Sequence, residues 1–299
     1  MNQNMVNAIK LMRYPFSVFL MPIFWFALCA YPEANLYKAL SVFLLVHGLL
    51  YPASNGYNSW FDKDEGSIGG LKNPPPVNPK LIWLVNISDL LAIVWAAFIS
   101  WPFAGLMLIY IVMSRAYSNP ATRLKKRPFA GTLTVITFQG GFMFLAMQYG
   151  MGNSISQLFS SENLVLALVS SLFLLGSYPL TQIYQHEEDG RRGDRTLSII
   201  LGINGTFIFS GISFGLATLI LCLDLGFKFG PILPAVYLFG MVPVLIIFTK
   251  WMLKVVSDRA EASFENTMQM NKVSSIMLSV VFITMWLLKT NGLAFANPF

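Results

Sequence analysis

Amide and carboxylate side chains recur at helical spacing in residues 51–66. Asn55, Asn58 and Asp62 stand three and then four residues apart. Residues at positions i, i+3 and i+7 of an α-helix lie on one face. A second stretch, 178–193, repeats this spacing with Gln182, Gln185 and Asp189. We therefore expect two helices that each carry a polar stripe of two amides and one aspartate.

The two stretches also align with each other, without a gap, at an offset of 127 residues. Five of the 16 positions are identical, and three more are Ser/Thr or Asn/Gln exchanges. About one identity is expected by chance, so the match indicates an internal duplication. The polar stripe is part of the repeated unit.

Further acidic residues accompany each stripe. Asp64 and Glu65 follow the first stripe, Glu187 and Glu188 lie within the second, and Asp194 follows the second. Clustered carboxylates repel one another unless a cation lies among them. Oxygen ligands, with no cysteine and a single histidine nearby, suit Mg²⁺. The sequence therefore favours a Mg²⁺ site, and the alternative is a charged loop in contact with water.

The elements that must position these residues are predicted to span a membrane. Of the 299 residues, 55% are hydrophobic and only 11% are charged, and the mean hydropathy is +0.60. A soluble domain carries about a quarter charged residues, so an ordinary soluble protein is excluded, and long apolar runs also exclude a nucleic-acid-binding protein. Nine segments are apolar enough to span a bilayer, namely 15–33, 37–57, 81–99, 102–118, 130–149, 163–184, 204–224, 231–250 and 272–289. We predict one all-α integral-membrane domain, residues 1–299, with two four-helix repeats and a ninth helix.

The basic residues predict how these spans are oriented. The N-terminus and the longer loops hold 17 of the 20 Lys and Arg residues. Cytoplasmic loops are enriched in basic residues, so the N-terminus and both stripes are expected on the cytoplasmic side. The first segment is followed by no small-residue cleavage signal, and we expect an uncleaved span.

Four stretches resemble the UbiA-type intramembrane prenyltransferase superfamily. Residues 58–65 (NSWFDKDE) are similar to the first Asp-rich motif of that family, and residues 185–197 to the second. Residues 117–125 are similar to a YSxPPxRLK run, and residues 11–15 to the Arg-Pro entry into the first helix. Three residues stand where many members have aspartate: Ser59, Gly66 and Gln185.

The resemblance implies an enzyme that transfers a prenyl group, which belongs to the transferases of alkyl or aryl groups other than methyl. Its donor would be an allylic polyprenyl diphosphate, and its acceptor a small lipophilic compound, usually an aromatic or quinone precursor. Asp62 and Asp189 would be catalytic. The implied Mg²⁺ ligands are Asp62, Asp64, Glu187, Glu188 and Asp189. The implied diphosphate-binding residues are Asn58, Arg123, Lys125, Lys72, Arg13 and Gln185, although the cations among them could instead contact lipid headgroups.

Asp89, inside the third predicted span, has two open interpretations. A carboxylate within the membrane faces the bundle interior, where Asp89 could orient the acceptor together with Tyr117. The alternative is a structural ion pair with Arg115. Residues 257–272 are expected to form either an interfacial helix over the site or a simple connector.

Two other classes of function fit the same pattern. A membrane terpene cyclase would keep the Mg²⁺ and diphosphate site but would use no acceptor. A secondary transporter also uses internal repeats and polar helix breaks, but near the middle of the membrane, whereas these stripes lie at the cytoplasmic ends of the spans. The expected location is the cell inner membrane, with the active site facing the cytoplasm.

Overall fold

The computed structural model describes residues 3–292, and this part of the chain is helical between its connections. The α-helices are α1 (Gln3–Leu11), α2 (Tyr14–Ser17), α3 (Met21–Ala30), α4 (Leu36–Leu45), α5 (Tyr51–Asp62), α6 (Lys80–Ile99), α7 (Trp101–Ser118), α8 (Pro128–Val135), α9 (Phe142–Met151), α10 (Ile155–Leu158), α11 (Ser161–Leu180), α12 (His186–Arg192), α13 (Leu197–Phe229), α14 (Ile232–Ser257) and α15 (Phe264–Thr290). Two π-helical segments continue these helices, η2 (Val46–Leu50) and η4 (Ile136–Gly141). The short 3₁₀ turns are η1 (Val18–Leu20), η3 (Leu124–Lys126), η5 (Ile183–Gln185) and η6 (Arg259–Glu261). The all-helical prediction is confirmed.

Eight helical stretches within residues 3–292 are long and apolar enough to cross a membrane. They are Gln3–Ala30, Leu36–Asp62, Lys80–Ile99, Pro128–Met151, Ser161–Arg192, Leu197–Phe229, Ile232–Ser257 and Phe264–Thr290. Each overlaps one predicted segment. The remaining predicted segment, 102–118, forms α7, a helix of 18 residues that contains Arg115 and is not among these eight.

Two segments that the sequence places outside the spans are helical. Residues 3–11 form α1, where Ala8 and Leu11 are buried against α5 and α6. Residues 264–272, expected in a connector or a separate interfacial helix, form the first turns of α15, and the side chain of Ser263 caps that helix. The last span therefore begins earlier than its apolar sequence suggests.

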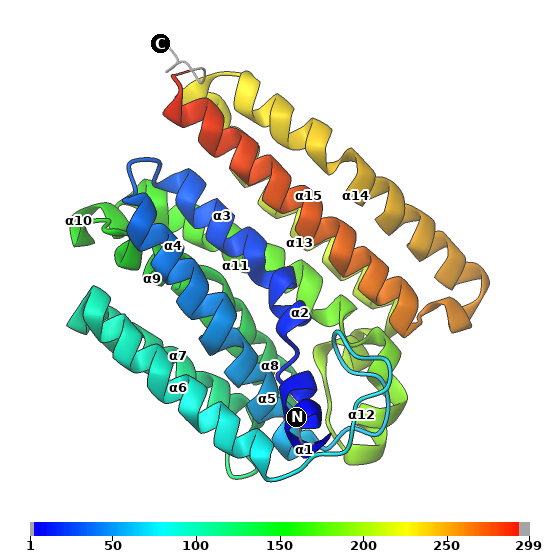
Figure 1. The fold of residues 1–299 in the computed structure, drawn as a ribbon. Helices are drawn as coiled ribbons and strands as arrows, with labels where there is room; N and C mark the ends of the chain where they lie inside the picture. The colour runs from blue at the N-terminus through cyan, green and yellow to red at the C-terminus, as the bar shows by residue number, and fades with distance from the viewer. Residues whose placement is uncertain (1–2, 293–299) are drawn as a thin grey trace.

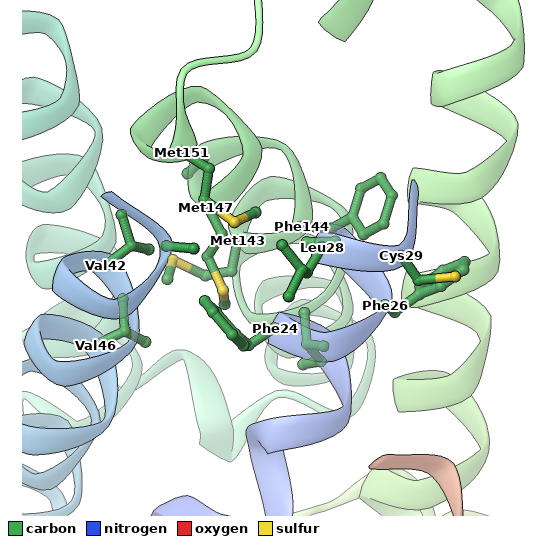
Figure 2. Close-up of a cluster of buried hydrophobic side chains, with 14 of the residues drawn as sticks. Phe24, Phe26, Leu28, Cys29, Val42, Val46, Met143, Phe144, Met147 and Met151 are labelled. Carbon is green, nitrogen blue, oxygen red and sulfur yellow. The ribbon is translucent and has the colours of Figure 1, made fainter. Parts of the chain in front are cut away.

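The interior of the bundle is held by close packing. Figure 2 shows buried side chains of α3, α4, η2 and α9 that belong to one cluster, among them Phe24, Phe26, Leu28, Val42, Val46, Met143 and Met147. Lipid tails are as apolar as these side chains, so van der Waals contact, rather than exclusion of water, is what favours their association. Gly150 on α9 permits the close approach, since a Cβ there would lie 2.8 Å from atoms of Phe103 and Val42.

The polar stripes meet at one end of the bundle. In Figure 1, α6 and α7 run together at one edge and α14 and α15 at the opposite edge, while the end of α5, the loop 63–79 and α12 gather at one end. Hydrogen bonds join this loop to the second repeat. Arg192 donates to Asp64 (2.5 Å), and Gln185 donates to the carbonyl of Ser67 (3.3 Å). Two segments more than 100 residues apart in sequence therefore form one site.

Candidate active site

The first polar stripe lies on α5, as predicted. Asn58 donates through Nδ2 to Oδ2 of Asp62 (2.8 Å) and to Oγ of Ser118 on α7 (3.1 Å). Arg13, in the break between α1 and α2, donates to Oδ1 of Asn58 (3.3 Å) and to the carbonyl of Asn55 (3.1 Å). The left-handed backbone of Arg13, with φ 51°, interrupts the first span and turns this side chain toward α5. The stripe is thus hydrogen-bonded to α7 and to the break between α1 and α2.

The second stripe does not lie on one continuous helix, so this part of the prediction is wrong. α11 ends at Leu180, and the 3₁₀ turn η5 separates it from α12. Pro179 has no N–H to donate into the last turn of α11, which weakens the helix at this point. The side chains of the stripe still line the same cavity as the first stripe: Gln182, Gln185 and Asp189.

A cavity of about 620 Å³ runs from this end of the bundle into its interior. Its charged lining, called the charged mouth below, consists of Arg13, Asp62, Asp64, Lys125, Asp189, Arg192 and Asp194. Aromatic side chains line other parts of its wall: Phe26, Phe138, Phe173, Phe214, Tyr237, Phe248 and Phe282. The cavity therefore combines a highly charged end with apolar walls.

Ion pairs across the charged mouth neutralise two of its aspartates. Asp62 pairs with Lys125, and both side chains are largely buried, with 4% and 12% of their surface exposed. Asp64 pairs with Arg192 at 2.5 Å, and Glu188 contacts the same guanidinium at 2.6 Å. The first pair joins η3 to α5, and the Asp64–Arg192 pair links the loop after α5 to α12.

A bidentate pair closes the other side of the charged mouth. Arg123 donates through Nε (3.1 Å) and Nη2 (2.9 Å) to the two carboxylate oxygens of Asp194. These hydrogen bonds raise the pKa of the Arg123 guanidinium above its usual value. Arg123 is not among the described residues that line the cavity, but Nη2 lies 3.9 Å from Oδ1 of Asp62. The predicted diphosphate ligand Arg123 thus contacts two aspartates of the mouth.

Some predicted site residues are not brought to this group. Lys72 pairs with Glu265, and both side chains are more than half exposed. Glu187 is 88% exposed and lies 3.9 Å from Arg191. Glu188 reaches only the rim, through Arg192. Within residues 3–292, neither Lys72 nor the two glutamates line the cavity.

The two acceptor-side candidates differ in their surroundings. Asp89 accepts hydrogen bonds from Nη2 (2.7 Å) and Nε (3.3 Å) of Arg115, which also donates to Asn86 (2.8 Å). This is the structural ion pair that the sequence offered as an alternative. Tyr117 lines the cavity, and its hydroxyl is hydrogen-bonded to that of Tyr178 at 2.7 Å. Tyr117 and not Asp89 therefore faces the space in which a substrate would lie.

The donor chemistry of the charged mouth suits Mg²⁺. Asp62, Asp64 and Asp189 present carboxylate oxygens to one cavity, which are ligands that Mg²⁺ prefers. Buried Oδ1 of Asp62 accepts no hydrogen bond in the described part of the protein, and a buried acceptor without a partner is costly. Residues 3–292 contain no group of three or more His, Cys, Asp or Glu side chains arranged to hold an ion. The residues thus fit an ion that takes one or two carboxylates and completes its shell with water or phosphate oxygens.

Sequence reasoning assigned no role to Arg192 and counted Asp194 only among the clustered carboxylates. Both lie in the stretch 185–197 that resembles the second Asp-rich motif, so a signal for them was present. Their ion-pair partners could not be predicted from the local sequence, because Asp64 is 128 residues from Arg192, and Arg123 is 71 residues from Asp194.

The fold and the site together define a multi-pass membrane protein with a charged opening into an apolar cavity. A model of the UbiA prenyltransferase family matches residues 19–276, and the chain belongs to this family. It is therefore an integral-membrane enzyme of the prenyltransferase class, and the resemblance found in the sequence is confirmed.

Solved structures share the fold at low sequence identity. A UbiA homolog from Archaeoglobus fulgidus bound to GPP and Mg²⁺ is 15% identical, with a TM-score of 0.69, and the match covers 95% of this chain and 99% of that chain. The apo structure of a UbiA homolog from Aeropyrum pernix K1 is 17% identical, with a TM-score of 0.68 and coverage of 90% and 97%. A structure of digeranylgeranylglyceryl phosphate synthase is 19% identical, with a TM-score of 0.55 and coverage of 97% and 99%. No curated protein matches the chain.

Proposed function

We propose that this enzyme uses Mg²⁺ to transfer a prenyl group from an allylic polyprenyl diphosphate to an aromatic or quinone-precursor acceptor in the membrane. The observation that carries the proposal is the union of the charged mouth with an apolar cavity of about 620 Å³. A prenyl diphosphate has the same division into an anionic head and an apolar tail. The similar Archaeoglobus fulgidus protein binds GPP and Mg²⁺, which supports this ligand class.

The diphosphate would bind at the charged mouth. Arg13 is 7% exposed and lines the cavity, and its Nε makes no hydrogen bond within the described residues, so this N–H is available to a phosphate oxygen. Lys125 adds a point charge beside it. Mg²⁺, when bound, would neutralise charge on the leaving diphosphate, and Asp62, Asp64 and Asp189 are the residues that would hold it.

The apolar walls serve the second half of the reaction. When the bond between C1 and the diphosphate oxygen breaks, its electron pair leaves with the diphosphate, and C1 becomes an allylic cation. Aromatic faces stabilise such a cation, and a dry cavity keeps water from capturing it. The tail would lie in an apolar lobe between α3, α13, α14 and α15, which is lined by Phe26, Phe214, Leu238, Leu245, Phe248 and Phe282. The acceptor then bonds to C1 and releases one proton.

The proposal includes nine membrane spans in two four-helix repeats plus one, with the N-terminus and the charged mouth in the cytoplasm. The distribution of 17 of the 20 basic residues supports this orientation. The span that completes nine would be α7, the fourth in chain order, which packs along α6. The cell inner membrane is the proposed location, and cysteine labelling of the loop 63–79 from either side tests the orientation.

Diphosphate release tests the proposed site directly. Purified protein is incubated with Mg²⁺, labelled prenyl diphosphates of several lengths and a panel of aromatic acceptors. Asp62→Ala and Asp189→Ala are expected to lower kcat/KM at least a hundredfold, about 2.7 kcal/mol. Asp224→Ala is the matched control, because Asp224 pairs with Lys228 four residues away and does not line the cavity. Unchanged diphosphate release in both site variants would refute the assignment.

The same assay separates transfer from cyclisation. A terpene cyclase releases a hydrocarbon or terpenol from the diphosphate alone, whereas a prenyltransferase gives a product that contains the acceptor. We expect product only when an acceptor is added.

A further inference from the structure

The cavity has a second, uncharged region beyond the charged mouth, between α5, α7, η4 and α11. This region, called the polar lobe below, is lined by Ser54, Tyr110, Ser114, Gln139 and Ser170. Ser54 precedes Asp62 by eight residues on α5, so it lies about 12 Å deeper at 1.5 Å per residue. The Tyr117–Tyr178 pair also faces the cavity, on the same helices α7 and α11. Ser54 is thus about two helical turns further into the bundle than Asp62. Arg13 lies between them, since it donates to the backbone carbonyl of Asn55 and to Oδ1 of Asn58.

A π-helical segment shapes the polar lobe. Gln139 lies within η4, which interrupts the helix between α8 and α9. Such segments are rare and are frequently found at functional sites. Gly140 and Gly141 allow η4 to pack directly on α11, since a Cβ at Gly140 would lie 2.8 Å from Cα of Ser171. The N–H of Gly141 donates to Oγ of Ser171 (3.0 Å), which fixes this register.

The polar lobe offers hydrogen-bonding groups that the protein itself does not fully use. Ser170 is 2% exposed, lines the cavity, and its hydroxyl has no hydrogen-bond partner in residues 3–292. The hydroxyls of Ser54 and Ser114 are hydrogen-bonded to each other at 2.6 Å across α5 and α7. A buried polar group without a partner is unfavourable, and a hydrocarbon tail would leave it so. A ligand with hydroxyl or carbonyl groups would satisfy it.

The five side chains of the polar lobe carry no charge. The cation established nearest to them is Arg13, which donates to the carbonyl of Asn55, one residue after Ser54, and which the proposed function assigns to the diphosphate. With Arg13 paired to the diphosphate, an ionised carboxylate or phosphate in the polar lobe would be buried without a counter-charge of its own, which is strongly unfavourable. Aromatic side chains border the lobe, namely Tyr110, Phe138 and Phe173, and they suit a flat ring.

We propose that the polar lobe is the acceptor subsite and that it selects an uncharged aromatic acceptor bearing hydroxyl or carbonyl groups. This inference rests on the proposed function, because only a transferase needs an acceptor. The acceptor ring lies in the polar lobe with its nucleophilic carbon toward the charged mouth. Once the diphosphate has left with the electron pair, that carbon bonds to the allylic cation at C1, and the ring then loses one proton to the released diphosphate.

Matched acceptor pairs test the selection for an uncharged ring. The purified enzyme receives Mg²⁺, one labelled prenyl diphosphate, and either a neutral compound or its carboxylate. The pairs are hydroquinone with 2,5-dihydroxybenzoate, phenol with 4-hydroxybenzoate, and 1,4-dihydroxynaphthalene with 1,4-dihydroxy-2-naphthoate. For each pair from which the enzyme forms a product, we expect kcat/KM to be at least tenfold higher with the neutral compound than with its carboxylate.

Two variants test the location of the subsite. Gln139→Leu is expected to raise KM for the neutral acceptor roughly three- to tenfold, the usual effect of one lost hydrogen bond, with KM for the diphosphate unchanged. Gln269→Leu is its control, because Gln269 is exposed on α15 and does not line the cavity. Ser170→Ala is expected to raise the acceptor KM while leaving Tm unchanged or higher, since it removes an unpartnered buried hydroxyl. A merely structural serine would lower Tm instead.

Each outcome has a defined meaning. Equal or better use of the carboxylates overturns the selection for neutral acceptors. The assignment of the polar lobe as the acceptor subsite is overturned if the enzyme binds the diphosphate but uses neither member of any pair. It is also overturned if both variants leave the acceptor KM unchanged. Failure of a non-hydrolysable prenyl diphosphate analogue to bind at all refutes the proposed function itself.

Discussion

Replacing Lys125 with methionine tests whether a buried ion pair holds the charged mouth together. Lys125 pairs with Asp62, and their side chains are 12% and 4% exposed. Methionine keeps much of the side-chain volume and removes the charge. Asp62 would then be a buried carboxylate whose nearest remaining cation is Arg123, at 3.9 Å from Oδ1.

The size of the effect follows from the burial of both partners. Two unit charges about 4 Å apart interact with about 4 kcal/mol at an effective dielectric constant of about 20. Removing one partner of a buried pair costs about 3–5 kcal/mol, and the nearby Arg123 places the expected loss near the lower end. For a chain of this size, about 3 kcal/mol corresponds to a fall in Tm of roughly 6–12 °C.

Thermal unfolding in detergent or nanodiscs measures this loss, with a double-mutant cycle to isolate the pair. The Lys125→Met/Asp62→Asn double variant is expected to recover most of the lost Tm, because it leaves no unpaired charge. Added Mg²⁺ should raise the Tm of Lys125→Met more than that of the unmodified protein, since a cation then binds a carboxylate that has no competitor. Lys126→Met is the control, because Lys126 is exposed. A Tm within about 2 °C of the unmodified protein, or a double variant as unstable as the single one, would refute the reasoning.

Three further substitutions probe other parts of the molecule. Asp89→Asn should lower the free energy of unfolding by about 1–3 kcal/mol, because the ion pair with Arg115 is lost, and the acceptor KM should stay unchanged. A turnover defect without loss of Tm would instead assign Asp89 to the reaction. Gly140→Ala should lower the free energy of unfolding by about 1–3 kcal/mol, because the added Cβ would lie 2.8 Å from Cα of Ser171; a fall in Tm measures this. An unchanged Tm would mean that η4 does not pack on α11 as described. Gly215→Leu should lower kcat/KM at least tenfold for four-isoprene donors but little for two-isoprene donors, because Gly215 lines the cavity and a Cβ there meets no atom within 4 Å. Equal effects on both donors would contradict this use of the apolar lobe, and Gly105→Leu on exposed α7 is the control.

Local periodicity was sufficient to predict the first half of the site. Asn58 and Asp62 are four residues apart, so an uninterrupted helix must place them side by side, and they are hydrogen-bonded at 2.8 Å. The same rule failed for Gln182 and Asp189, because α11 ends at Leu180. Pro179 indicates in the sequence that a break is near, but a single proline in a long apolar run does not show where the next helix begins.

The partners of the charged residues required the tertiary structure. Lys72 and Lys125 are both lysines in loops that the sequence places on the same side, yet Lys125 is buried against Asp62 and Lys72 pairs with exposed Glu265. Nothing in the local sequence distinguishes them, because the difference depends on segments that are distant in the chain. The π-helical turn that brings Gln139 into the polar lobe is likewise set by contact of Gly140 and Gly141 with α11.

The sequence by itself determined that the chain is helical, that it lies in a membrane, and that two duplicated stretches carry polar side chains at helical spacing, because composition and short-range spacing act through the bilayer and the helix repeat. Only the tertiary structure decided which carboxylates share one cavity, which cations neutralise them, and that an uncharged polar lobe lies about 12 Å further in. The physical reason is that ion pairing and cavity shape depend on where helices distant in sequence come into contact. The spacing of residues along a single helix does not predict those contacts.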